Sequence, residues 1–111
     1  MLTLRIKKKW YDMILSGKKK EEYRDIKPYY DARIMNAFGA IWVNNKLVSG
    51  LFEEFRKEIP VKVLFINGYH KDAPRFIADC TMDVGVGKEE WGAEPGKRYY
   101  ILKIENIYQE D

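Results

Sequence analysis

The C-terminal half of the chain alternates apolar and polar residues, and this pattern constrains the fold more than any other feature of the sequence. In residues 75–84 the apolar side chains of Phe76, Ala78, Cys80, Met82 and Val84 recur at every second position. Spacing by two places them all on one face of a strand. The segments 61–66 (VKVLFI) and 99–107 (YYILKIENI) predict two further strands. Strands gathered late in the chain argue against a doubly wound parallel sheet and favour an α+β domain or a small barrel.

The first residues predict a strand followed by a helix. Residues 2–6 (LTLRI) alternate as a half-buried strand does, and residues 8–16 repeat their apolar side chains with helical spacing. Gly17 then stands where a left-handed residue ends a helix.

The middle of the chain predicts mainly helix. Residues 28–35 can start one, although Gly39 and the IWVNNKLVSG that follows it leave the next segment open. Residues 51–59 gather their apolar side chains on one helical face before Pro60, which predicts another helix. Four glycines and a proline in residues 85–98 predict a long loop before the last strand.

Length and composition bound the class of protein. A chain of 111 residues that is 46% hydrophobic fits one domain with one core. The single Cys80 cannot close an internal disulfide, and with the single His70 it cannot supply a structural zinc set. We therefore expect a reducing, cytoplasmic setting, with no metal or other cofactor. The apolar stretches fall far short of the roughly 20 residues that cross a bilayer, and no leader pattern opens the chain, so we expect a soluble protein without membrane contact.

Positive charge is concentrated at the start of the chain. The net charge is +3 overall, whereas residues 1–27 hold nine Lys or Arg against four Asp or Glu, a surplus of five. A basic face of this kind attracts polyanions. Lysines that only keep a small protein in solution give the same count, so both interpretations stay open.

The segment 16–25, SGKKKEEYRD, is the strongest candidate for a site. It loses helical spacing, so we expect an extended strand with Glu22 and Arg24 on one side and Tyr23 on the other. Lys19, just after the helix, then joins Glu22 and Arg24 in one pocket. The alternative is an exposed strand whose charges pair with their neighbours.

These three residue types together suit an anionic ligand with amino groups. Arg24 can hold a phosphate or carboxylate in a fork, and Lys19 can act as a point charge or an adjustable base. Glu22, kept ionised between two cations, suits accepting a hydrogen bond from an amino group.

The segment GKKKEEYR reads as Gly-x-Lys-x-x-Glu-x-Arg, which resembles the signature of the ASCH domains, a family related to the PUA RNA-binding domains. The signature falls on Gly17, Lys19, Glu22 and Arg24. The segments ILSG, VLFINGY and WGAEPGKRYYILKIENI also look like pieces of small bacterial or phage ASCH proteins. The resemblance implies one ASCH domain over residues 1–111, a PUA-like small mixed β-barrel with flanking helices, and a cleft whose floor carries the signature.

The resemblance also implies two classes of function. Most relatives are thought to bind RNA or nucleotides, which makes single-stranded RNA, a nucleotide or a nucleoside the expected partner. Some similar proteins hydrolyse N4-acetylcytidine with the signature lysine, a threonine and a distant glutamate, and others are proposed ribonucleases. This chain has Glu22 in place of that threonine, while Glu89 or Glu90 is a candidate for the distant acid. Binding is favoured, and if the protein is an enzyme, Lys19 and Glu22 are its catalytic residues.

Other residues extend the predicted site. Tyr69 and His70 follow a turn and are candidates for a lip that stacks a base, with Tyr69 counted among the ligand-binding residues. We expect Trp10 to pack in the core and Trp91 to plug its loop, each with base stacking as the alternative. Cys80 predicts a buried strand cysteine and not a nucleophile. The basic residues that form a predicted rim for nucleic acid are Lys7, Lys8, Lys9, Lys18, Lys20, Lys97 and Arg98.

Overall fold

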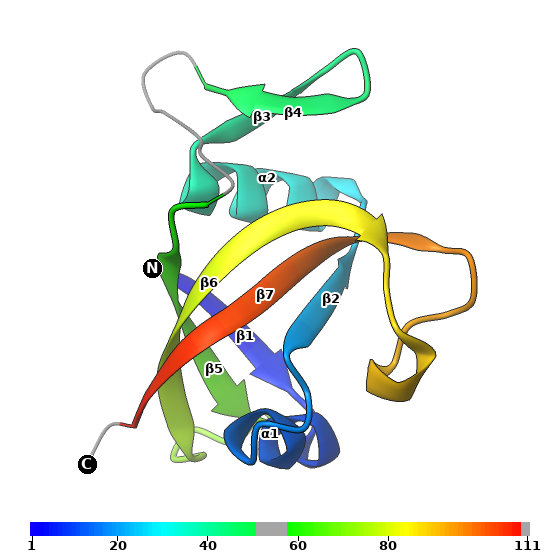
Figure 1. Cartoon of the computed structure of the whole chain (residues 1–111). Coiled ribbons are helices and arrows are strands. Elements are labelled where there is room, and N and C mark those ends of the chain that lie inside the picture. The colour runs from blue at the N-terminus through cyan, green and yellow to red at the C-terminus, as the bar shows by residue number, and fades with distance from the viewer. Residues whose placement is uncertain (51–57, 110–111) are drawn as a thin grey trace.

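A computed structural model describes residues 1–50 and 58–109 of the chain. Five strands form one strongly curled sheet (Figure 1). Across the sheet, the strands are β1 (Leu2–Ile6), β5 (Val61–Asn67), β6 (Arg75–Val86), β7 (Arg98–Gln109) and β2 (Glu21–Asp25). The strands predicted from the sequence are all present, within two or three residues of their expected bounds.

The sheet is mixed and curls into a half-barrel. β1 pairs with β5 in parallel, and every other pairing in the sheet is antiparallel. A register shift between Asp79 and Cys80 on β6 marks a bulge, which lets this long strand bend. The expected α+β class and a small barrel-like sheet are therefore confirmed. β1 and β2 are the two edge strands, and the opening between them is where the candidate site lies.

In the part of the chain that the structure describes, two α-helices flank this sheet (Figure 1). α1 (Lys8–Leu15) lies across one end and buries Tyr11 and Ile14. α2 (Pro28–Phe38) lies on the opposite side of the molecule from α1 and buries Ile34 and Phe38. α2 begins with proline, whose fixed φ suits the first turn, and it ends at a glycine with φ of 69°.

The segment that the sequence left open is a two-stranded hairpin beyond α2, which corrects the expectation of a mainly helical middle. β3 (Ala40–Val43) and β4 (Lys46–Ser49) pair antiparallel. Asn44 and Asn45 join them with φ of 49° and 62°, the two positive values that a type I′ turn needs. The helix predicted over 51–59 falls mostly outside the described residues.

A hydrogen-bonded chain ties the hairpin to the sheet. The Trp42 indole donates to the Tyr100 hydroxyl at 2.7 Å, and that hydroxyl donates to the Asp31 carboxylate on α2. Tyr100 is fully buried, and burial together with Asp31 raises its pKa to about 12.

The apolar core lies on the concave side of the sheet and under both helices. The Phe76 ring packs 5.0 Å from Tyr11 and 5.2 Å from Phe65, measured between ring centroids. Cys80 is fully buried on β6, which confirms the prediction of a buried strand cysteine, and burial raises the pKa of its thiol to about 12. Within the described ranges, no helix is long and apolar enough to cross a membrane.

Candidate functional site

Three charged side chains of the signature meet at the opening between β1 and β2. Lys19 Nζ lies 3.1 Å from Glu22 Oε1, and Arg24 Nη2 lies 3.3 Å from Glu22 Oε2. Lys19 is 2% exposed and Glu22 6% exposed, so the alternative of a solvated charged strand is wrong for this pair. The expected clustering of the three side chains is present in the structure.

Gly17 allows the turn that brings Lys19 to this cluster. Its φ of 81° lets the chain reverse after α1, and the backbone N–H groups of Lys18 and Lys19 both donate to the Met13 carbonyl. Gly17 itself does not line the cleft, and a Cβ added there has no atom within 4 Å. Its contribution is therefore backbone conformation and not ligand contact.

The Lys19 ammonium is enclosed by partners. Nζ donates to the Trp91 carbonyl at 2.6 Å and lies 4.2 Å from the centroid of the Trp10 ring. Burial lowers the pKa of Lys19, while the neighbouring Glu22 carboxylate works in the opposite direction. Lys19 therefore ties the loop that carries Trp91 to the end of α1.

The Glu22 carboxylate is shared between cations and backbone. Besides Lys19, Oε1 accepts the backbone N–H of Tyr23 at 3.1 Å, while Oε2 accepts from Arg24. Two cations thus face one carboxylate, so the three side chains together carry one positive charge.

Arg24 spans the gap between the two edge strands. Its Nη2 donates to the Arg5 carbonyl on β1 at 3.2 Å, and its guanidinium lies 5.7 Å from the centroid of the Tyr30 ring on α2. The Nε–H of Arg24 is buried and has no acceptor among the residues that the structure describes. The guanidinium thus bridges the half-barrel while keeping one donor that the described protein does not satisfy.

A cleft of about 230 Å³ opens over these residues. Its described lining carries four cationic side chains and one carboxylate, a surplus of three positive charges, together with five aromatic rings. The lining residues are Arg5, Ile6, Lys7, Trp10, Lys19, Glu22, Tyr23, Arg24, Tyr69, Trp91, Gly92 and Tyr99. Cations beside aromatic rings are the side chains that bind phosphates and stacked bases.

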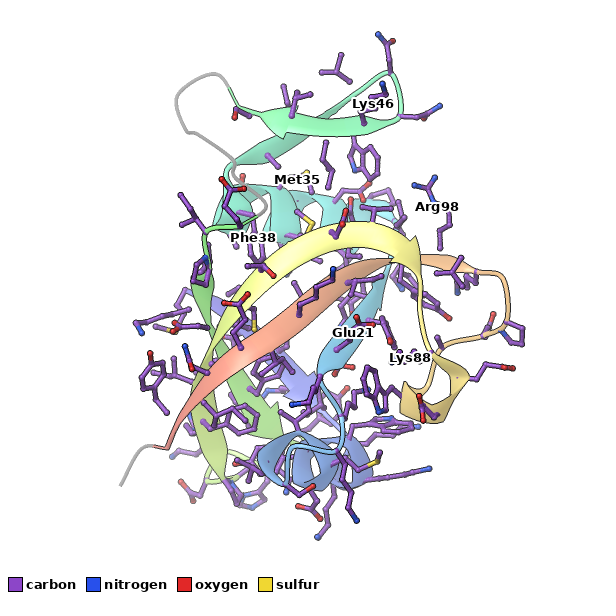
Figure 2. All side chains as sticks on the ribbon, viewed as in Figure 1. Glu21, Met35, Phe38, Lys46, Lys88 and Arg98 are labelled. Atoms are coloured by element: carbon purple, nitrogen blue, oxygen red, sulfur yellow. The ribbon has the colours of Figure 1, made fainter. Side chains whose placement is uncertain are left out.

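The loop before β7 forms one wall of the cleft, because Tyr23 holds it against β2. The Tyr23 hydroxyl donates to Glu21 Oε1 at 2.7 Å and accepts the backbone N–H of Lys88 at 2.9 Å. Figure 2 labels Glu21 on β2 and Lys88 in the facing loop. A Cβ at Gly87 would lie 2.7 Å from the Tyr23 ring, so only glycine allows this approach.

The short 3₁₀ helix η1 (Glu89–Trp91) in this loop presents Trp91 to the cleft. Its indole N–H donates to the Lys18 carbonyl at 3.0 Å, so the ring is held in place, half-buried, at the wall of the cleft. Glu89 and Glu90 are exposed and do not line the cleft, so neither is placed to act on a ligand there.

The predicted rim residues divide into those at the cleft and those away from it. Lys7 lines the cleft, and Lys9 lies 4.6 Å from the Trp10 ring centroid. Lys97 pairs with Asp25 at 3.0 Å, because β7 adjoins β2. Arg98 lines another hollow beside the β3–β4 hairpin (Figure 2). The remaining three predicted rim residues, Lys8, Lys18 and Lys20, are exposed in the structure. Lys8 pairs with Asp12.

The aromatic residues only partly follow the expectations. Tyr69 is 83% exposed and lines the cleft as the predicted lip, whereas His70 is exposed and does not line it. Trp10 is half-buried at the cleft wall, which corrects the prediction that it packs in the core. Tyr23 also lines the cleft, which corrects the expectation that it points to the other side from Glu22 and Arg24. Arg5 and Tyr99 were not predicted as cleft residues, because their approach depends on how the sheet curls.

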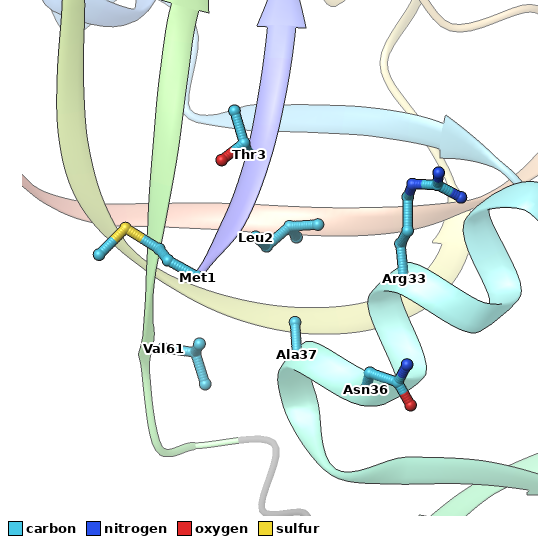
Figure 3. A pocket seen from close by; sticks show the side chains of 7 residues that line it. All are labelled: Met1, Leu2, Thr3, Arg33, Asn36, Ala37 and Val61. Atoms are coloured by element: carbon cyan, nitrogen blue, oxygen red, sulfur yellow. The ribbon is translucent and has the colours of Figure 1, made fainter.

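A larger hollow, about 600 Å³, lies elsewhere, between the start of β1 and α2 (Figure 3). Its described lining includes one charged side chain, Arg33, beside mainly small and apolar residues. Volume alone does not supply recognition, since binding sites need convergent polar groups. The smaller cleft is therefore the better candidate site.

Within residues 1–50 and 58–109, no three His, Cys, Asp or Glu side chains are grouped so that they can hold a metal ion. In comparisons with protein-family models, curated proteins and solved structures, no match to this chain was found.

Proposed function

We propose that this chain is an ASCH-type domain with a PUA-like fold that binds single-stranded RNA or a nucleotide in the cleft. The observation that carries the proposal is the surplus of three positive charges among five aromatic rings in the cleft lining. Cations neutralise phosphates, and bases stack on exposed rings. The Gly17, Lys19, Glu22 and Arg24 signature and the curled mixed sheet support the family assignment. The single buried cysteine suits a reducing, cytoplasmic setting.

The phosphate contacts fall to the cations that a ligand can reach. Lys19 is 2% exposed and already bonded to Trp91 and Glu22, so it contributes charge from beneath the surface. Arg24, Arg5 and Lys7 line the same cleft with more of their side chains open to solvent. We assign the direct contacts with phosphate oxygen to these three residues, with the Lys19 charge behind them.

Glu22 supplies the recognition of a base. A carboxylate oxygen has two acceptor positions, and among the residues that the structure describes Oε2 accepts one hydrogen bond, from Arg24. The remaining position suits an exocyclic amino group, which adenine, cytosine and guanine carry and uracil lacks. Glu22 is 6% exposed, so only a base that enters the cleft reaches it.

Hydrolysis of RNA or of a modified nucleoside is the second candidate function. It is favoured by the buried ion pair of Lys19 and Glu22, in which burial lowers the pKa of the lysine. Such a pair suits proton transfer when a substrate reaches it. Poor access of a substrate to Lys19 disfavours hydrolysis, because the Trp10 ring and the Trp91 carbonyl enclose the ammonium.

The test is fluorescence anisotropy of a labelled single-stranded RNA over a salt series, followed by a denaturing gel of each sample. Wild type is expected to bind with strong salt dependence and to leave the RNA intact. Arg24→Ala is expected to weaken binding and flatten the salt slope. The matched control is Arg98→Ala, which removes the same charge outside the cleft.

Two results would change the assignment. RNA fragments that appear with wild type and vanish with Glu22→Gln would make the protein a nuclease and give Glu22 the proton-transfer role. Equal losses of affinity in Arg24→Ala and Arg98→Ala would show that binding does not depend on the cleft.

A further inference from the structure

A second hollow continues from the cleft along β1 toward α2. It has a volume of about 220 Å³ and shares Arg5, Arg24 and Tyr69 with the cleft. The two hollows therefore adjoin at these three residues, and together we call them the proposed groove. We name the far part of it, lined by Tyr29, Tyr30 and Arg33 of α2, the α2 groove.

The α2 groove has the side chains that bind a single-stranded nucleic acid. Its described lining holds three arginines, three tyrosines and no carboxylate, counting the three residues shared with the cleft. An arginine and an aromatic ring in contact offer a phosphate partner and a stacking surface in one place. The lining thus repeats the chemistry of the cleft one step further along β1.

The aromatic surface of the α2 groove is ordered by its own contacts. The Arg33 guanidinium lies 3.6 Å from the centroid of the Tyr29 ring and donates to the Tyr29 carbonyl at 3.0 Å. The rings of Tyr29 and Tyr30 meet edge to face at 4.9 Å. Tyr29 is nevertheless 54% exposed, so the ring is held in place while remaining open to a ligand.

We infer that the ligand of the proposed RNA-binding cleft is an oligonucleotide and not a single nucleotide. One nucleotide occupies the cleft, and the strand continues past Arg5 and Arg24 so that a neighbouring base stacks at Tyr29 and its phosphate meets Arg33. Arg24 contacts both parts, because it lines both hollows. This inference rests on the proposed function and adds the length and the path of the ligand.

The experiment compares a single-stranded RNA of about six nucleotides, within the usual site size, with 5′-CMP. Binding of each is measured to wild type and to Tyr29→Ala/Arg33→Ala, by anisotropy for the RNA and by calorimetry for CMP. Both changed residues are exposed, so the fold is expected to persist, and circular dichroism checks it. The RNA is expected to bind the double variant about tenfold or more weakly, with CMP affinity unchanged.

A matched control double variant removes a cation and an aromatic ring that lie outside the groove. Lys62 lies 4.1 Å from the Tyr108 ring centroid, and neither residue lines the cleft or the α2 groove. Lys62→Ala/Tyr108→Ala also removes one positive charge and one exposed ring, and it is expected to change RNA affinity about twofold or less.

Three results would overturn the inference. RNA affinity that does not change in the Tyr29/Arg33 variant would show that the strand does not follow the α2 groove. Equal losses of RNA affinity in both double variants would show that the effect comes from general electrostatic attraction and not from contacts in the α2 groove. If wild type binds neither CMP nor RNA, the proposed function itself fails, and the inference fails with it.

Discussion

The Arg24 guanidinium on β2 donates a hydrogen bond to the Arg5 carbonyl on β1, 3.2 Å away, across the open side of the half-barrel. These two strands are the edges of the sheet, so one side chain bridges a gap that no backbone pairing closes in the described structure. The same guanidinium holds Glu22 and lines both hollows of the proposed groove. Arg24 therefore both bridges the two edge strands and lines the proposed binding groove.

Arg24→Lys tests that double role. Lysine keeps the charge but lacks the planar fork, so it cannot hold Glu22 and reach the Arg5 carbonyl with the same geometry. We expect a loss of about 1–2 kcal/mol in the free energy of unfolding and weaker RNA binding. Urea unfolding and anisotropy measure the two effects. Wild-type values in both would contradict the bridging role.

Lys19→Met tests the buried ion pair. Methionine removes one of the two cations that face Glu22 and leaves the Trp91 carbonyl without its donor. Breaking such a pair is expected to cost roughly 3 kcal/mol, and changing Glu22 to an apolar residue as well should restore part of it. Lys20→Met, at an exposed position, is the control and is expected to change stability by less than about 0.5 kcal/mol. Equal unfolding midpoints for the two single variants would refute the structural role of Lys19.

Two glycines near the cleft, Gly17 and Gly87, are predicted to differ in their response to alanine. Gly17→Ala places a side chain at φ of 81° with free space around it, which should cost about 1 kcal/mol through backbone strain alone. Gly87→Ala puts a Cβ within 2.7 Å of the Tyr23 ring, so the loop that carries Trp91 must move. We therefore expect Gly87→Ala to lose more RNA affinity than its loss of stability explains. Thermal melts measure the stability of each variant, and anisotropy measures its RNA affinity. Unchanged affinity would mean that this loop does not shape the cleft.

Stability is predicted to fall in alkaline solution, in part through Tyr100. Burial and Asp31 raise the pKa of the Tyr100 hydroxyl to about 12 in the folded protein, from an ordinary value of 10.0. Between these values the unfolded chain has lost the proton that the folded chain keeps, so the free energy of unfolding decreases as pH rises. Tyr100→Phe should cost about 1–3 kcal/mol at neutral pH, because Asp31 and Trp42 lose a partner, and should flatten the alkaline slope. Urea unfolding from pH 7 to 11 measures both, and an unchanged slope would contradict this assignment.

The sequence predicted the parts of the fold that depend on local pattern. Alternation of apolar residues located the strands, and Gly17 marked the end of α1 through its positive φ. The hairpin after α2 was not predicted, because its signal is the Asn44–Asn45 turn between two strands of only four residues each. Its docking depends on Tyr100, which is distant in sequence.

In the candidate site, too, only the residues that are close in sequence could be predicted together. Lys19, Glu22 and Arg24 are close in sequence, so strand alternation was enough to bring them together. Arg5 and Tyr99 reach the cleft only because β1 and β7 curl around the core, and Trp10 lies at its wall because Lys19 sits beneath its ring. The α2 groove likewise depends on where α2 packs, which no local pattern reveals.

The central claim, that RNA occupies the cleft, is tested most directly by the three tryptophan indole N–H signals in a two-dimensional ¹⁵N–¹H NMR spectrum. Trp10 and Trp91 line the cleft. Trp42 lies on β3 of the hairpin, where its indole donates a hydrogen bond to Tyr100, and its signal serves as an internal control. On addition of the short single-stranded RNA, we predict that the Trp10 and Trp91 signals shift while the Trp42 signal stays in place. Binding that shifts Trp42, or that leaves Trp10 and Trp91 unchanged, would contradict the account.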